Sequence, residues 1–276
     1  MSRYQTLAFL KLLEHDLPDQ VVCEFCGKLH RIRDAKKYVK KFAPVREPHC
    51  LFIDHMFSVA ELIHENFSTT LFKMTMKHYH RFGYDAQSRQ LLNLLSKKSH
   101  TNVWAKGSKK EKAECQIKNG SLFTERHIDF RGTCTDLERN RYPIIFRICP
   151  HLEVKSVPCL AGLRITTSYP LPIEKKWSAL LHFWNGTNIK KISWDLCSEL
   201  QQCVYCRTEY KTGLKHGFSC TFKFTITIWK DLGQGPEGEE WKSLIANENW
   251  PPEPIQFQGG EIASIFQKGR SDWARD

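Results

Sequence analysis

Residues 197–233 read CSELQQCVYCRTEYKTGLKHGFSCTFKFTITIWKDLG, and this stretch decides the fold that we expect. Its last third carries the clearest strand signal in the chain, from Cys220 to Trp229, where apolar and polar residues alternate. A period of two places one set of side chains on each face of a sheet. The set that we expect to face the core is Phe222, Phe224, Ile226 and Ile228.

Upstream of this strand, Thr208–Lys211 and the turn residues Gly213 and Gly217 predict the other arm of a β-hairpin. The base of the hairpin is a C-x-x-C pair formed by Cys203 and Cys206. A turn with this spacing aims two thiolates at one point, which is typical of a zinc knuckle.

Further ligands for such a site must come from other parts of the chain. Cys149 and His151 stand two residues apart at the end of the apolar segment 143–150, so we expect their side chains to point the same way. Cys159 and Cys197 are the other upstream candidates. Thiolate and imidazole match the borderline softness of zinc, and a closed set of four would form a structural site. The competing interpretation is a group of ordinary buried thiols.

A second C-x-x-C pair lies near the N-terminus and is followed at once by Gly27. The preceding valines predict a short strand that enters a tight turn, and glycine lets the backbone fold around a metal. His49, beside Cys50, is a further candidate ligand. We expect a second zinc-knuckle-like cluster whose candidate ligands are Cys23, Cys26, His30 and Cys50.

The whole chain predicts an α+β fold, with N-terminal helices followed by a mainly antiparallel β region. We expect a helix-rich part at 1–96 that contains the first C-x-x-C knuckle. A basic, solvated loop follows at 97–112, and a β-rich part with the C-x-x-C hairpin occupies 113–276. Together these parts are expected to form one compact unit.

Periodicity places individual elements within this outline. Apolar stripes at helical spacing predict helices at 3–15, 53–66 and 87–95. The segment 70–84 fits a helix or a strand, because its periodicity matches both. In 116–130 a weak alternation is interrupted by the turn residues Asn119 and Gly120.

Composition and charge bound the environment of the protein. The chain has 276 residues and a net charge of +11, which favours acidic partners and polyanions. Segment 97–112, with six lysines and one glutamate, is the candidate contact for nucleic acid. No apolar run approaches the ~20 residues of a membrane span, so we expect no membrane contact and a cytoplasmic or nuclear location. In those compartments the eleven cysteines should be free or metal-bound.

The sequence contains no recognisable catalytic signature, so we name no catalytic or cofactor-binding residue. Glycine-rich phosphate loops, G-x-S-x-G and H-E-x-x-H are all missing. His151-Leu152-Glu153 together with the later C-x-x-C pair is similar to the zinc deaminase pattern H-x-E…P-C-x-x-C, but Gln202 stands where that pattern has proline.

The chain also resembles a large family of uncharacterised proteins of filamentous fungi, many of which carry an F-box at the N-terminus. The resemblance rests on FLKLLEHDLPDQVVCEFCGKLHR (9–31), LFKMTMKHYHRFGYDAQSRQLLNLL (71–95), RICPHL (147–152), and CVYCRTEY (203–210) with TITIWKDLG (225–233) and Trp241. No LP-x-E stretch of an F-box precedes Arg3. The resemblance therefore implies the region downstream of the F-box, and a role related to F-box substrate receptors.

These observations favour a non-enzymatic, zinc-stabilised protein-interaction module. Structural zinc is the only cofactor that we expect, and the sequence does not identify the protein partner. Two alternatives remain open, a basic nucleic-acid-associated protein that binds through 97–112 and a zinc-dependent enzyme.

Overall fold

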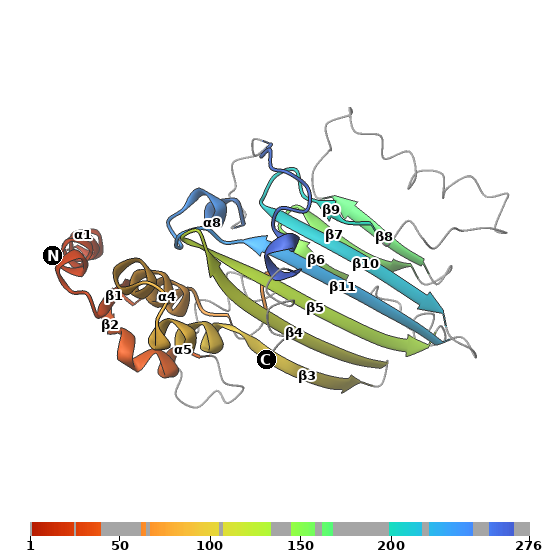
Figure 1. Ribbon diagram of the computed structural model, residues 1–276, viewed down its shortest axis with the longest axis horizontal. Coiled ribbons are helices and arrows are strands. Elements are labelled where there is room, and N and C mark those ends of the chain that lie inside the picture. The colour runs from red at the N-terminus through yellow and green to blue at the C-terminus, as the bar shows by residue number, and fades with distance from the viewer. Residues whose placement is uncertain are drawn as a thin grey trace.

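The computed structural model of the protein describes residues 2–24, 26–39, 62–64, 67–104, 107–133, 145–157, 162–167, 199–216, 221–244 and 254–267. It confirms the α+β class, because helices precede a mainly antiparallel β region (Figure 1). The N-terminal elements are α1 (Arg3–Asp16), β1 (Gln20–Cys23), β2 (Lys28–Arg31), the 3-10 helix η1 (Ile32–Tyr38), α4 (Thr69–Phe82) and α5 (Ala86–Leu95). The following elements are β3 (Lys97–Trp104), β4 (Gly107–Lys118), β5 (Ser121–Thr133), β6 (Ile145–Cys149), β7 (Leu152–Val157), β8 (Gly162–Thr167), β9 (Gln201–Gln202), β10 (Thr208–His216), β11 (Thr221–Asp231) and α8 (Glu239–Leu244).

Local sequence signals account for the helical end of the molecule. Ser2 and Gln5 form a capping box at the start of α1. The last carbonyls of α1 and the loop after it are held by the Lys77 ammonium of α4, which donates to Glu14 O, Leu17 O and Gln20 O at 2.6–2.8 Å. Segment 70–84, whose periodicity fitted two structures, is helical in α4.

Six strands form the large antiparallel sheet, in the order β3-β4-β5-β11-β10-β9. The β4–β5 turn falls at Asn119 and Gly120, which have φ angles of 50° and 80°. Two successive positive φ angles match the right-handed twist of a tight hairpin and favour this residue pair. The centre of the sheet pairs β5 with β11 along its whole length, from Phe123 beside Asp231 to Thr133 beside Thr221.

A second sheet of three strands, in the order β6-β7-β8, covers one face of the large sheet. The Phe146 ring of β6 lies 6.2 Å from the Phe130 ring and 5.3 Å from the Phe224 ring of the large sheet, measured between centroids. The alternation predicted for β11 is confirmed, since Phe224, Ile226 and Ile228 are buried. The side chain of Phe222 lies outside the described residues.

The opposite face of the large sheet is mostly polar, and a C-terminal segment covers one end of it. Phe123 and Trp229 form a small apolar cluster there with Ile262 and Phe266. Figure 1 shows this segment, in dark blue, against β5 and β11. The main core lies on the other side and also includes residues of α4 and α5, so the helices and the sheets share one core.

The prediction of a solvated loop at 97–112 is wrong, because this segment forms β3 and the first part of β4. The lysines there are not all solvated. The Glu111 side chain is buried and lies 3.3 Å from the Lys97 ammonium, 2.8 Å from the Lys109 ammonium and 2.9 Å from Arg126 Nε. These ion pairs hold β3, β4 and β5 together through buried charged side chains, whereas composition alone predicts that such side chains are exposed.

The predicted turn glycine Gly213 is also corrected. It lies inside β10 and pairs with Thr225, and an added Cβ would approach Thr225 Oγ1 to 2.7 Å. A glycine in a strand interior often marks such a close approach. The helix predicted at 53–66 falls mainly outside the described residues.

Candidate metal centres

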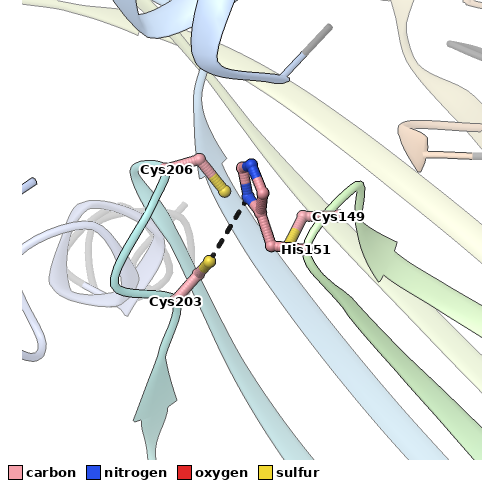
Figure 2. Close-up of side chains that lie close together, drawn as sticks. All are labelled: Cys149, His151, Cys203 and Cys206. Carbon is pink, nitrogen blue, oxygen red and sulfur yellow. Dashed lines mark hydrogen bonds between the residues drawn. The ribbon is translucent and has the colours of Figure 1, made fainter. Parts of the chain in front are cut away.

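The first candidate metal centre joins two hairpin turns from different sheets. Cys149 ends β6 and His151 stands in the tight turn before β7, while Cys203 and Cys206 stand in the turn between β9 and β10. Figure 2 shows the four side chains pointing toward one centre. Their ligand atoms all lie within 4.8 Å of one another, and the Cys203 Sγ to His151 Nδ1 distance is 3.6 Å.

Backbone hydrogen bonds fix the C-x-x-C turn in this shape. Cys203 N donates to Thr208 O at 2.9 Å, and Thr208 N donates to Cys206 O at 2.7 Å. Tyr205 N donates to Cys203 Sγ at 3.4 Å, so the sulfur already accepts an amide N–H. Donors of this kind stabilise the thiolate form, which is the form that binds metal.

All four ligand residues are buried, with Cys206 fully excluded from solvent. Hydrogen bonds from Cys149 and Cys206 lower the pKa of the Cys203 thiol well below its usual range. Burial raises the pKa of the Cys149 and Cys206 thiols instead. The protein environment alone therefore favours one thiolate in the cluster, and a bound cation would be needed to hold three.

The dimensions and the donor set fit zinc. Tetrahedral zinc bound at about 2.0–2.3 Å places its ligand atoms roughly 3.3–3.8 Å apart, so no pair of ligand atoms would need to approach by more than about 1.5 Å. A Zn²⁺ ion with three thiolates and one neutral imidazole would form a cluster with a net charge of −1. The group is buried, and a buried charge requires a partner.

Lys230 of β11 would be the partner for the charge of such a cluster. Its side chain is buried, and its ammonium donates to the carbonyl of Ile148, next to the ligand Cys149. Burial lowers the pKa of Lys230, and negative charge on Cys149, Cys206 or Cys203 opposes this shift. Among the described residues no carboxylate pairs with this ammonium. A metal–thiolate cluster at this site would supply the missing anion.

A second polar group is unsatisfied at the same place. The hydroxyl of Tyr210 is buried and has no hydrogen-bond partner among the described residues. Burial raises the pKa of Tyr210, and the charges of Cys149 and Cys203 raise it further, so the phenol lies near these sulfurs. A metal-bound thiolate there would accept its O–H.

The second candidate centre lies in the β1–β2 turn near the helices. Cys23 ends β1, Cys26 and Gly27 form the turn, and His30 lies on β2. Gly27 has a φ of +61°, which the turn requires. The three ligand atoms again lie within 4.8 Å of one another, with 3.1 Å between Cys26 Sγ and His30 Nε2.

The ring of His30 is oriented from its other side. Its Nδ1 lies 2.7 Å from the Tyr38 hydroxyl of η1, which leaves Nε2 directed at the cysteines. This is the usual arrangement of a metal-ligating histidine, in which the second nitrogen is held by a neighbouring polar group. The centre is less enclosed than the first, because Cys26 and His30 are only half-buried.

The structure brings together seven of the nine predicted ligands, in two separate groups. The other two, Cys50 and Cys197, lie outside the described residues, as does Cys159. Sequence reasoning missed Lys230 and Tyr38. For Lys230 a signal existed, since the residue continues the even-numbered set of Phe224, Ile226 and Ile228 that faces the core.

The zinc deaminase pattern is only partly matched by this geometry. His151 and the C-x-x-C pair do converge, but His151 lies in a turn between two strands. Cys149 adds a fourth ligand to the group. Four protein ligands complete a tetrahedral zinc site and leave no position for a substrate or an activated water.

Comparison of the chain with protein-family models, with curated proteins and with solved structures finds no match. Within the described residues, no helix combines the length and the apolar character that crossing a membrane would need.

Proposed function

We propose that this protein is a non-enzymatic interaction module whose two sheets are fastened together by a structural zinc ion. The observation that carries the proposal is the convergence of Cys149, His151, Cys203 and Cys206, all buried, from the turns of two sheets. A zinc ion there would add its binding free energy to folding. The resemblance to F-box-associated proteins favours a protein among its partners.

A zinc ion with four protein ligands would stabilise the fold and would not react. Structural zinc sites are closed in this way, whereas catalytic sites keep one position open. Cys23, Cys26 and His30 would hold a second ion beside the helices. This centre would stabilise the β1–β2 turn, against which α1 packs.

The test is a metal count on the intact protein by native mass spectrometry, with Cys203→Ser plus Cys206→Ser as the diagnostic variant. The wild type should carry tightly held zinc, and the double variant should lose one ion and melt at a lower temperature. Cys115→Ser is the matched control, because Cys115 is also buried but belongs to neither group. Burial raises the pKa of that thiol to about 12, as expected of an inert core cysteine.

A wild-type protein without zinc would overturn the proposal, and so would a double variant that keeps its full zinc content. Cys23→Ser plus Cys26→Ser should release a different ion, and the two losses should add. If the Cys115→Ser control also loses zinc, the loss reflects general unfolding and the assignment of ligands is wrong.

A further inference from the structure

The polar face of the large sheet carries a set of basic side chains that the metal centres do not explain. We call it the cationic face. It comprises Lys110, Lys112, Arg131, Lys211, Lys215 and Lys223. These residues come from four neighbouring strands, yet they occupy one face, because paired residues of an antiparallel sheet lie on the same side.

Strand register arranges these cations in rows. In the first row Arg131 pairs with Lys223, and Lys223 pairs with Lys215 on the next strand. Two residues further along, Lys110 pairs with Asp129. Neighbouring strands lie about 4.8 Å apart, and residues two positions apart in a strand lie about 6.8 Å apart. The charges therefore form a regular grid that a linear polyanion can follow.

The third row also carries basic residues, with one lysine at each end. Lys112 pairs with His127, which pairs with Thr227, which in turn pairs with Lys211. His127 is exposed, and its Nδ1 lies 3.0 Å from Thr227 Oγ1. The row adds two cations and the hydrogen-bonding side chains of His127 and Thr227 to the face.

Half of the cations on this face have no carboxylate partner among the described residues. Lys110, Lys211 and Lys215 are exposed and form no ion pair with the described residues. Lys223 and Arg131 share one carboxylate, that of Asp129, at 2.9 and 3.6 Å. The remaining cation, Lys112, pairs with Glu114. Six cations thus meet the carboxylates of Asp129 and Glu114, with the buried Glu125 beside Lys112 and His127, and the excess positive charge of Lys110, Lys211 and Lys215 is open to solvent.

The composition of the face selects the class of partner. The exposed large apolar side chains of the described residues belong to α1, to the region of Phe82 and Tyr84, and to Leu200, and none lies on the cationic face. A protein partner would need a buried apolar or aromatic anchor, which this surface does not offer. Phosphate backbones are instead contacted by lysine, arginine and hydroxyl groups, and Thr225 and Thr227 lie among the lysines.

We infer that the cationic face binds the phosphate backbone of a nucleic acid, without reading its sequence. This inference names a class of partner for the interaction module proposed above, and it rests on the non-enzymatic role proposed there. It does not require a bound metal ion. Among the described side chains, this face has no exposed Phe, Tyr or Trp ring for base stacking, so the attraction is mainly electrostatic and falls steeply with salt.

The test is fluorescence anisotropy with a labelled 20-nucleotide single strand of mixed sequence, titrated at several salt concentrations. The variant Lys110→Gln, Lys112→Gln, Lys211→Gln removes three cations of the face. Since each phosphate contact contributes about 0.7 to the slope of log K against log salt for a single strand, the slope should fall by about 2. The matched control removes three exposed cations elsewhere, with Arg33→Gln, Lys36→Gln and Arg89→Gln, and should keep the wild-type slope.

Three outcomes would overturn the inference. In the first, the wild type does not bind the strand at 50 mM salt. In the second, the slope of log K against log salt falls equally in both triple variants, which would mean that only net charge matters. In the third, a poly-glutamate peptide binds the wild type as tightly as the nucleic acid does, and the face would then be a site for acidic proteins. Zinc content and melting temperature of each variant separate these results from a failure of the proposed metal centre.

Discussion

Replacing Phe224 with alanine tests the packing of the two sheets. The ring is 1% exposed and lies 5.3 Å from the Phe146 ring of the small sheet. A buried phenylalanine removes about 150–250 Å² from water, worth roughly 4–6 kcal/mol at about 25 cal/mol per Å². Alanine retains a small part of this, so Phe224→Ala should lower the free energy of unfolding by about 4 kcal/mol, within the range measured for such changes.

The neighbouring Thr225 provides the control, because its side chain lies on the opposite face. It is half-exposed, and its Oγ1 donates one hydrogen bond to Gly213 O at 3.3 Å. Thr225→Ala should cost about 1 kcal/mol or less. Guanidinium unfolding at a fixed zinc concentration, followed by tryptophan fluorescence, gives both values. Equal costs would refute the assignment of faces.

A double-mutant cycle sharpens the same prediction. Phe146→Ala alone should also destabilise, and the combined variant should show a coupling of about 0.5–1.5 kcal/mol between the two rings. Strict additivity would mean that the small sheet does not pack on the large sheet at this point.

Two further predictions concern buried charge. Glu111→Gln should cost about 3 kcal/mol in unfolding free energy, because it leaves the cations of Lys97, Lys109 and Arg126 without their shared carboxylate; a change within 0.5 kcal/mol would show that solvent already screens them. Burial lowers the pKa of His64 from 6.5 to about 3, so the unfolded chain binds a proton between these values and the folded chain does not, and stability is lost as pH falls below 6.5. Between pH 7 and 5 the wild type should therefore lose about 2 kcal/mol more than His64→Gln, and parallel losses would contradict the buried, neutral imidazole.

Local patterns predicted the parts of the structure that depend on local physics. The alternation ending at Ile228 predicted the buried face of β11, and Asn119 and Gly120, predicted as turn residues, form the β4–β5 turn. The spacing of Cys149 and His151 indicated two ligands on one side of a turn. In each case neighbouring residues decide the geometry.

The remaining features depend on partners far away in the sequence. Lysine-rich composition suggested a loop at 97–112, because nothing local reveals that Glu111 meets Arg126 across the β4–β5 pair. The contact between Trp229 Nε1 and Glu125 joins residues 104 positions apart. Pairing over such a distance is set by the whole core, and a single sequence does not display it.

The two edge strands of the large sheet, β3 and β9, determine whether it can pair with another copy of the protein. An edge strand presents unpaired N–H and C=O groups, which can recruit a strand from another chain. At one edge β9 is only two residues long, too short to serve as a template. At the other edge β3 starts with Lys97 and Lys98, and its pairing with β4 is irregular between Lys97 and His100. A bulge twists an edge strand away from a possible partner, so the irregular β3 and the short β9 both oppose growth of the sheet by addition of further copies.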